Sequence, residues 1–360
     1  MPLRPITLDD VESLAVGAFI LGTGGGGDPY QGLLNLRSLY AQGARLELMP
    51  PADLADDDWV AAVSEMGAPL VGLERLSDSR VIARAVALME EHTGYRFRGI
   101  MALEIGGGNG LAPLLAAAHL GRPVIDADMM GRAFPEAQMT SAAVGDLQPW
   151  PLAAVDPRGV ETVVQRVPTW KWMERVSRKV CVEMGSTAAT CKAPRTGAEV
   201  KRWGIPGTTT KAIAIGAAVR AAQARHDDPV AAVLAVEPGH VLFRGKIVDV
   251  ERRTSEGFLR GRAVLEGTGE WRSAGLAIDF QNEWLVAWHD ERALATVPDL
   301  ICLLDAQSGH AVGTETARYG QRVVVMALPP PPVFMTPRGL SFVGPRAFGY
   351  DMDYRSVFAS

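Results

Sequence analysis

The sequence predicts an α/β protein in two domains, an N-terminal α/β domain over residues 1–166 and a C-terminal domain over residues 167–360. The chain has 360 residues, 48% of them hydrophobic, which exceeds the usual size of a single domain. A strand, helix and strand pattern between residues 100 and 125 predicts a parallel βαβ unit. After His226, short β-rich segments separated by turn residues predict a mainly β unit.

The first elements are predicted from helix caps and hydrophobic periodicity. Thr7, followed by acidic residues, is typical of a helix N-cap, and this helix should end near Leu21. A glycine run follows, and Asp28 with Pro29 predicts the start of a second helix. The other elements expected before the βαβ unit are a helix over 30–41, strands over 45–49 and 59–64, and a helix over 78–91.

The βαβ unit is predicted from four consecutive patterns. An apolar run over 100–103 suits a buried strand, and a glycine-rich turn follows over 104–110. An Ala/Leu-rich helix over 111–120 should end at Gly121, before a second strand over 123–125. We expect the crossover between the two strands to be right-handed, as such connections nearly always are.

The C-terminal domain is expected to begin with two amphipathic helices, over 170–189 and 208–225, interrupted by Pro194 and by the segment 205–207. The β-rich unit should run from 230 to 328. Its expected strands lie at 230–236, 240–250, 258–266, 276–280, 284–288, 300–304 and 322–328. Four prolines at 329–332 form a stiff spacer before the C-terminal tail.

Composition excludes several classes of function. The net charge is -5, with acidic and basic residues interleaved, so we expect no nucleic-acid partner. The longest apolar stretches are too short to span a bilayer, and the N-terminus lacks the apolar core of a secretory signal, which predicts a cytoplasmic protein without a membrane partner. Three cysteines without a C-x-x-C pair argue against a disulfide framework and a structural zinc site.

The strongest local signal is the glycine-rich loop that contains Thr23, Gly24, Gly25, Gly26, Gly27 and Asp28. Residues without a Cβ let backbone N–H groups approach an anion or a planar ligand, and the helix that follows adds a partial positive charge. We therefore predict substrate binding here, with a flexible connection between helices as the alternative. The loop also satisfies G-x-G-x-x-G, which would fit an NAD(P)-dependent oxidoreductase if residues 16–21 formed a strand.

Three acidic residues follow the two strands of the βαβ unit. Glu104 comes after the first strand, and Asp126 and Asp128 come after the second. Because parallel strands present their carboxyl ends at one edge, we expect these carboxylates to converge, and either to act as general acid and base or to hold a divalent metal ion. The alternatives are that Asp128 caps a turn and that Glu104 pairs with Arg132.

Four further residues are candidates for the same site. Gly107 and Asn109 follow Glu104 and would add donors for an anion, with an ordinary tight turn as the alternative. Met66 and Gly67 lie at the end of the strand predicted over 59–64, beside the acidic Glu65.

One histidine and one cysteine are further candidates for chemistry. His310 lies in a polar loop after an apolar strand and would act as acid, base or ligand if it reached the cleft; a surface loop is the alternative. Cys191 precedes Lys192, so it is conceivable as a nucleophile, although buried cysteines are commonly inert.

Several motifs together resemble the S-methyl-thiohydantoin desulfurase-like family, and they occur in that family's order over nearly the whole chain. The matching segments are Ile20–Pro29, Met66–Pro69, Val71–Glu74, Glu104–Gly107, Asp126–Glu136, Val182–Gly185 and Ile205–Thr208. The resemblance implies an N-terminal α/β domain and a C-terminal domain with a swivelling β/β/α-type unit. It carries over Gly24 to Gly27, Glu104, Asp126 and Asp128 as site residues. At Glu65 and Cys181 the family more often has hydrophobic or small residues, so both rank lower as candidates.

The resemblance also implies an activity and partners. The family name implies hydrolytic removal of a thiol from a thiohydantoin ring, and the family is associated with hydantoinase/oxoprolinase proteins. We therefore predict a hydrolase of a small cyclic amide or thiohydantoin, in which one of the three acids or a bound divalent cation activates water. The alternatives are a non-catalytic partner subunit of a hydantoinase/oxoprolinase enzyme and the NAD(P)-dependent oxidoreductase. The expected partners are the small-molecule substrate, a hydantoinase/oxoprolinase protein and further copies of the chain as a homo-oligomer.

Overall fold

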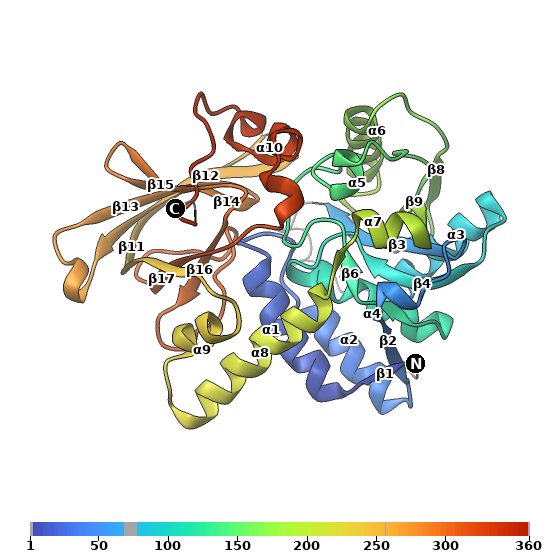
Figure 1. Ribbon diagram of the computed structural model, residues 1–360, viewed down its shortest axis with the longest axis horizontal. Coiled ribbons are helices and arrows are strands. Elements are labelled where there is room, and N and C mark those ends of the chain that lie inside the picture. Colours follow the sequence, from blue (N-terminus) through green and yellow to red (C-terminus); the bar gives the residue numbers. More distant parts are fainter. Residues whose placement is uncertain (1–2, 68–77, 256, 359–360) are drawn as a thin grey trace.

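The computed structural model describes residues 3–67, 78–255 and 257–358, and it is built on two β-sheets that lie side by side (Figure 1). The first sheet is mixed and belongs mainly to the N-terminal half, whereas the second sheet is antiparallel and belongs to the C-terminal half. The predicted α/β class with a parallel βαβ unit and a mainly β C-terminal unit is therefore confirmed. Of the sequence motifs, 68–69 and 71–74 lie outside the described residues.

The first sheet has eight strands in the order β1-β2-β5-β4-β3-β9-β7-β8. Their bounds are β1 Arg4–Ile6, β2 Leu46–Met49, β3 Trp59–Gly67, β4 Phe97–Ala102, β5 Val124–Ile125, β7 Leu152–Val155, β8 Glu161–Val164 and β9 Thr187–Thr196. The four strands β2, β5, β4 and β3 are parallel to one another. Their carboxyl ends therefore lie at one edge of the sheet, which is where open α/β sheets bind ligands.

The βαβ unit lies at the centre of this sheet. Strand β4 leads through a 3₁₀ turn, η3 (Gly107–Gly110), into helix α4 (Ala112–Leu120), and β5 returns parallel to β4. Gly121 ends α4 with a φ of +63°, a conformation that glycine adopts without strain. The facing residues Ile100 and Val124 are fully buried, so the unit forms part of the protein core.

Further helices accompany this sheet, some packed against its strands and some against one another. They are α1 Leu8–Leu21, α2 Tyr30–Ala41, α3 Arg80–Thr93, α5 Ser141–Val144, α6 Trp170–Glu183, α7 Gly197–Trp203 and α8 Thr208–Arg225. Helices α1 and α8 lie side by side (Figure 1). A Cβ atom at Gly17 of α1 would lie 1.8 Å from the carbonyl oxygen of Ala212, so glycine is required for this close approach. The predicted cap of α1 is present, because the Thr7 side chain accepts from the N–H of Asp10.

The helix predicted over 170–189 is wrong in its second part. Helix α6 ends at Glu183, and Gly185 and Ser186 have φ values of +85° and +62°, which break the helix. The following segment, β9, is buried along nearly its whole length and pairs antiparallel with both β3 and β7. Its alanine, threonine and cysteine residues suit a strand covered on both faces, so tertiary packing overrides the helical pattern.

The strand predicted over 230–236 is also wrong, because this segment is helix α9 (Pro229–Val236). The Asp228 side chain accepts hydrogen bonds from the N–H groups of Val230 and Ala231, and Pro229 occupies the first helical position. A short apolar run does not by itself distinguish a helix from a strand, and here the N-cap decides the outcome.

The second sheet has seven antiparallel strands in the order β15-β14-β13-β12-β11-β17-β16. Their bounds are β11 His240–Ser255, β12 Phe258–Gly267, β13 Gly275–Gln281, β14 Glu283–His289, β15 Arg292–Thr296, β16 Leu300–Asp305 and β17 Arg322–Leu328. The sheet curls, so that β14 approaches β16. A two-stranded ladder of β6 (Ala127–Asp128) with β10 (Ile205–Pro206) completes the described strands.

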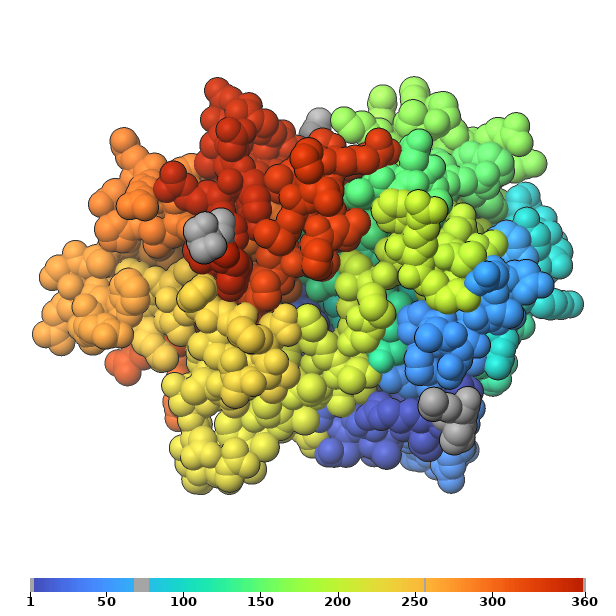
Figure 2. All heavy atoms as spheres, viewed as in Figure 1, coloured from blue at the N-terminus to red at the C-terminus, as the bar shows by residue number. Residues whose placement is uncertain are grey.

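The C-terminal tail follows the proline spacer and packs against both halves. It contains η5 (Pro332–Met335), α10 (Pro337–Val343) and η6 (Pro345–Phe348). Figure 2 shows this tail, in red, spread between the second sheet and the green residues of the first half. Arg338 donates to the carbonyl oxygen of Val144, and the N–H of Thr296 donates to the carbonyl of Arg355. Within the described residues, no helix combines the length and apolarity needed to cross a bilayer.

Candidate active site

A cavity of about 270 Å³ lies where the carboxyl ends of β3 and β4 meet the second sheet. We call it the interdomain pocket, because its walls come from both halves of the chain. Its principal lining residues are Gly26, Glu65, Glu104, Asn109, Lys192 and Glu283. The carboxyl-end edge of the parallel strands, where the sequence predicts a site, therefore forms part of a cavity.

The glycine-rich loop is mostly covered by the protein itself. A Cβ atom at Gly24 would lie 2.5 Å from Nε1 of Trp284, and one at Gly25 would lie 2.1 Å from Oε1 of Glu283. Thr23 is buried, and its hydroxyl accepts a hydrogen bond of 2.6 Å from Arg132. Of the six residues predicted to bind substrate here, Thr23, Gly24 and Gly25 are therefore packed against protein, whereas Gly26, Gly27 and Asp28 line the pocket.

The second glycine turn lies directly against the first. The N–H of Gly108 donates to the carbonyl of Gly27 at 2.9 Å, and a Cβ atom at Gly26 would lie 2.3 Å from the carbonyl oxygen of Gly106. Gly107 has a φ of +65° and is buried in this contact, so the predicted anion nest faces the first loop. The glycines thus bring the two loops together, and residues 16–21, which a dinucleotide fold needs as a strand, belong to helix α1.

Glu104 is the predicted acid that the structure places in the pocket. Its side chain is 7% exposed and accepts hydrogen bonds from Nδ2 of Asn109 and from the N–H of Phe134. Burial raises the pKa of Glu104 to about 7, against the lowering influence of these donors and of the Lys192 ammonium. A carboxyl group with such a pKa exchanges a proton readily near neutral pH, as a general base must.

Asn109 connects Glu104 with the end of strand β3. Its Oδ1 accepts a hydrogen bond of 2.7 Å from the N–H of Glu65, while its Nδ2 donates to Glu104. The Glu65 side chain is open to the solvent in the pocket, yet protein encloses it on its other sides, and this loss of hydration raises its pKa. Met66 and Gly67 also line the pocket, so both lie where the sequence analysis expected.

Glu283 is a site residue that the sequence analysis missed. It follows Asn282, which has a φ of +60° in the turn between β13 and β14, and it is only 2% exposed. Among the described residues, none makes a hydrogen bond to its Oε2 atom. Burial and the nearby Glu104 raise the pKa of Glu283 well above its ordinary value, against the attraction of Arg132. One signal was available, because Gln281, Asn282 and Glu283 interrupt two otherwise apolar strands.

Replacing Glu283 with glutamine should stabilise the fold, and increasingly so as the pH rises. Because the folded-state pKa of Glu283 is raised, the folded protein retains a proton that the unfolded chain loses above its ordinary pKa near 4.5. The wild type should therefore lose about 1.4 kcal/mol of relative stability per pH unit while that proton is retained. Urea denaturation at pH 5, 7 and 9 measures the difference, with the exposed Glu270→Gln as control. A difference that does not change with pH would contradict this account.

Lys192 is the second site residue that the sequence analysis did not select. It lies on β9, paired with Ala62 of β3, and its side chain is 7% exposed. Burial lowers the pKa of Lys192, while the carboxylates of Glu174 and Glu104 counteract this effect and Arg178 adds to it. Among the described residues, none accepts a hydrogen bond from this ammonium or forms an ion pair with it, and Lys192 lines the pocket. The ammonium is therefore available to an acceptor atom of a ligand.

Asp126 and Asp128 lie near the expected edge but do not line the pocket. Asp128 is fully buried, and its Oδ2 accepts from the N–H groups of Ile105 and Gly131 at 2.8 and 2.7 Å. Burial raises its pKa to about 7. Asp126 accepts from the N–H and the hydroxyl of Thr210 in the first turn of α8. The expected convergence of three acids in one cleft is thus corrected to two neighbours: Asp128 lies behind Glu104, close enough for Glu104 to raise its pKa, and fixes the loop there, whereas Asp126 caps a helix.

The Asp126→Ala substitution should lower the free energy of unfolding by about 0.5–2 kcal/mol, as the loss of a helix cap does. The reason is that two donors of Thr210 would lose their acceptor. Thermal or urea unfolding measures the loss, and Asp126→Asn, which retains one acceptor oxygen, should recover part of it. A fall in turnover without a loss of stability would instead return Asp126 to the catalytic group.

His310 and the cysteines lie away from the pocket chemistry. His310 is exposed in the loop after β16, where its carbonyl accepts from the N–H of Asp305, and it is not among the pocket residues. Its expected reach into the cleft is therefore corrected. The three cysteines are free and buried. Burial raises the pKa of the Cys191 thiol above its usual range, which makes it a poor nucleophile at neutral pH.

Arg132 lies behind the pocket and joins the two halves. Its guanidinium donates to the Thr23 hydroxyl and to the carbonyls of Ala133, Pro298 and Asp299. No described ion pair links it to Glu104, which was the alternative raised from the sequence. Burial lowers the pKa of Arg132 to about 10, so the group remains charged and attracts the nearby carboxyl groups.

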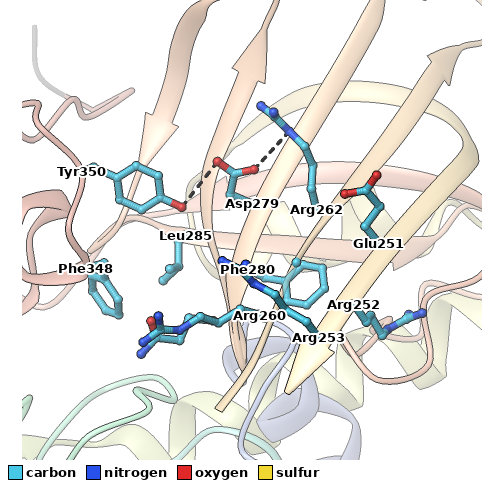
Figure 3. A pocket seen from close by; sticks show the side chains of 12 residues that line it. Glu251, Arg252, Arg253, Arg260, Arg262, Asp279, Phe280, Leu285, Phe348 and Tyr350 are labelled. Carbon is cyan, nitrogen blue, oxygen red and sulfur yellow. Dashed lines mark hydrogen bonds and ion pairs between the residues drawn. The ribbon is translucent and has the colours of Figure 1, made fainter. Parts of the chain in front are cut away.

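The described residues hold no group of three His, Cys, Asp or Glu side chains spaced as metal ligands would be. Within the described chain, a larger cavity of about 430 Å³ lies between strands β11 to β14 of the second sheet and the C-terminal tail (Figure 3). Of its two acidic residues, Glu251 and Asp279, the second already contacts Arg262, Trp288 and Tyr350. The interdomain pocket is thus the better candidate site.

Comparisons with known proteins agree with this architecture. A family model described as S-Me-THD-like, N-terminal domain matches residues 9–166, and one described as S-Me-THD-like, C-terminal domain matches residues 168–357. No protein of curated function matches the sequence. A crystal structure of a protein from Chromobacterium violaceum is similar in fold, with a TM-score of 0.82 and 23% identity over 98% of this chain and 99% of that chain. The chain belongs to the S-Me-THD-like family.

Proposed function

We propose that the chain is a hydrolase that removes the thiol from an S-methyl-thiohydantoin-like ring, a five-membered cyclic amide. The observation that supports this proposal is Glu104, a buried carboxyl group with a pKa of about 7 that lines a pocket of about 270 Å³. A pocket below the usual size of drug-binding cavities suits a ligand of a single ring. The family match supports a thiohydantoin-related role.

The proposed reaction needs one base and one group that binds the ring. Glu104 takes a proton from water as the water oxygen bonds to the ring carbon that carries the S-methyl group. The Lys192 ammonium donates to the ring carbonyl and stabilises the negative charge that develops in the ring. The carbon–sulfur bond then breaks with its electron pair on sulfur. Of the two protons of water, one ends on the ring nitrogen and one on the sulfur, which gives hydantoin and methanethiol.

The positions of the two residues support these roles. Glu104 is oriented by Asn109 and by the backbone of Phe134, so its carboxylate cannot rotate freely. Lys192 lies close enough to Glu104 for each group to influence the pKa of the other. Base and electrophilic donor therefore face one small cavity, which is what addition of water to an amide-like carbon requires.

The experiment is to incubate the purified chain with S-methyl-thiohydantoin and to quantify methanethiol with a thiol reagent and hydantoin by NMR. Both products should form in equal amounts, and oxygen from labelled water should appear in the ring carbonyl. The exposed Glu270→Gln variant should match the wild type. Binding of the ring without product would instead favour a non-catalytic subunit, and product formation that is independent of Glu104 would refute the mechanism.

A further inference from the structure

Glu283 is buried, and its carboxyl group fits against the protein only because residue 25 is a glycine. It comes from the second half of the chain, and its Oε1 occupies the space in which a side chain at position 25 would begin. Glu283 lines the pocket, and its Oε2 atom is buried without a hydrogen-bond partner among the described residues. Buried polar atoms without a partner are rare in native proteins, so an orphan acceptor in a cavity wall points to a ligand.

The thiol-removing reaction makes little use of this group. A thiolate is a stable anion and leaves carbon without first taking up a proton. An amine or ammonia does not leave as an anion near neutral pH, so a nitrogen leaving group requires a proton from an acid in the site. Burial raises the pKa of Glu283, so the group retains the proton that such an acid needs. The pocket therefore contains a proton donor that the release of a thiolate does not need but the release of a nitrogen group does.

We propose that the same pocket hydrolyses cyclic guanidines of the 2-amino-imidazol-4-one type, with Glu283 as the acid that protonates the departing nitrogen. This inference rests on the proposed function, because it uses the same ring position and the same base. Water adds to the ring carbon and gives one proton to Glu104, and the exocyclic carbon–nitrogen bond breaks as Glu283 donates a proton to the nitrogen. The second proton of water passes to the ring nitrogen, and Glu104 then returns its proton to Glu283, so the site is restored and the products are a hydantoin and ammonia.

The charges of the pocket suit such a ring at both ends. The carboxyl groups of Glu65 and Glu104 line the cavity and accept hydrogen bonds from the N–H groups of an amidine-like edge, beside the protonated Glu283. The Lys192 ammonium lies in the same wall and donates to the ring carbonyl. A ring with N–H donors on one side and a carbonyl on the other therefore matches the pocket in polarity as well as in size.

The test offers the full chain two cyclic guanidines, creatinine and 2-amino-imidazol-4-one, beside S-methyl-thiohydantoin. A coupled enzymatic assay measures ammonia, NMR measures the hydantoin products, and a thiol reagent measures methanethiol. We expect ammonia and hydantoin in equal amounts from at least one guanidine. In Glu283→Gln, ammonia release should fall by about 10²-fold or more, whereas methanethiol release should fall by less than about 10-fold. Glu270→Gln should leave both rates unchanged.

The outcomes separate the two proposals. Methanethiol without ammonia in the wild type overturns the inference and leaves the proposed function standing. Equal losses of both products in Glu283→Gln also overturn it, because they would mean that Glu283 supports the pocket and does not protonate one leaving group. Ammonia without methanethiol would retain the inference and refute the proposed substrate. If neither product forms, both proposals fail.

Discussion

Replacing Glu104 with glutamine is expected to lower turnover of S-methyl-thiohydantoin by about 10²–10⁴-fold, the usual contribution of a general base. Glutamine has nearly the same volume, but it cannot take a proton from water. The variant should remain folded, since its amide oxygen still accepts a hydrogen bond from the N–H of Phe134. Steady-state kinetics with a melting curve measures both quantities. Full turnover by a folded variant would remove Glu104 from the mechanism.

The pH profile adds an independent test of the same residue. A base acts only when it has lost its proton, so kcat/KM of the wild type should rise with pH and level off above the Glu104 pKa of about 7. The limb below pH 7 should be absent from the residual activity of Glu104→Gln. A profile that is flat between pH 5 and 8 in the wild type would contradict the assignment.

Replacing Arg132 with methionine is expected to lower the free energy of unfolding by about 3–5 kcal/mol, because several buried acceptors would lose a charged donor at once. The guanidinium is fully buried and donates to three backbone carbonyls and to the Thr23 hydroxyl. Methionine fills the space but offers no donor, so these acceptors would remain buried and unpaired. Urea denaturation monitored by tryptophan fluorescence measures the change.

The matched control for this substitution is Arg346→Met. Arg346 pairs with Asp351 and Asp353, but its side chain is 61% exposed, so solvent screens these ion pairs and their loss should destabilise the fold far less than the loss of Arg132. Similar losses of unfolding free energy in the two variants would show that the burial of Arg132 does not add to its contribution to stability. A loss only in Arg132→Met would show that the contact between the glycine-rich loop and the segment before β16 stabilises the whole molecule.

The sequence was sufficient for those parts of the fold that local patterns control. The cap at Thr7 and the glycine after α4 predicted the first helix and the βαβ unit, because these signals act within a few residues. It failed at β9 and α9, where short apolar segments fit two structures and distant contacts or a single cap decide between them. The burial of β9 between β3 and β7 cannot be derived from its own ten residues.

The candidate site was predictable only on one side. Glu104 and Asn109 follow a parallel strand, and the rule that ligands bind at the carboxyl ends of such strands placed them in the cavity. Glu283 and Lys192 arrive from the second half of the chain through strand pairing and sheet packing, which no local spacing encodes. The glycine run predicts a ligand-binding loop, whereas in the structure Gly24 and Gly25 chiefly make room for Trp284 and Glu283.

The place of β9 in the first sheet limits how such chains can be recombined. The segment that matches the C-terminal family model contributes this strand between β3 and β7, both from the segment that matches the N-terminal model. A chimera that takes one segment from this chain and the other from a relative would place the relative's β9 between β3 and β7 of this chain, or the reverse. Exchange of either segment alone should therefore yield insoluble chimeras unless the residues that face β9 are exchanged with it.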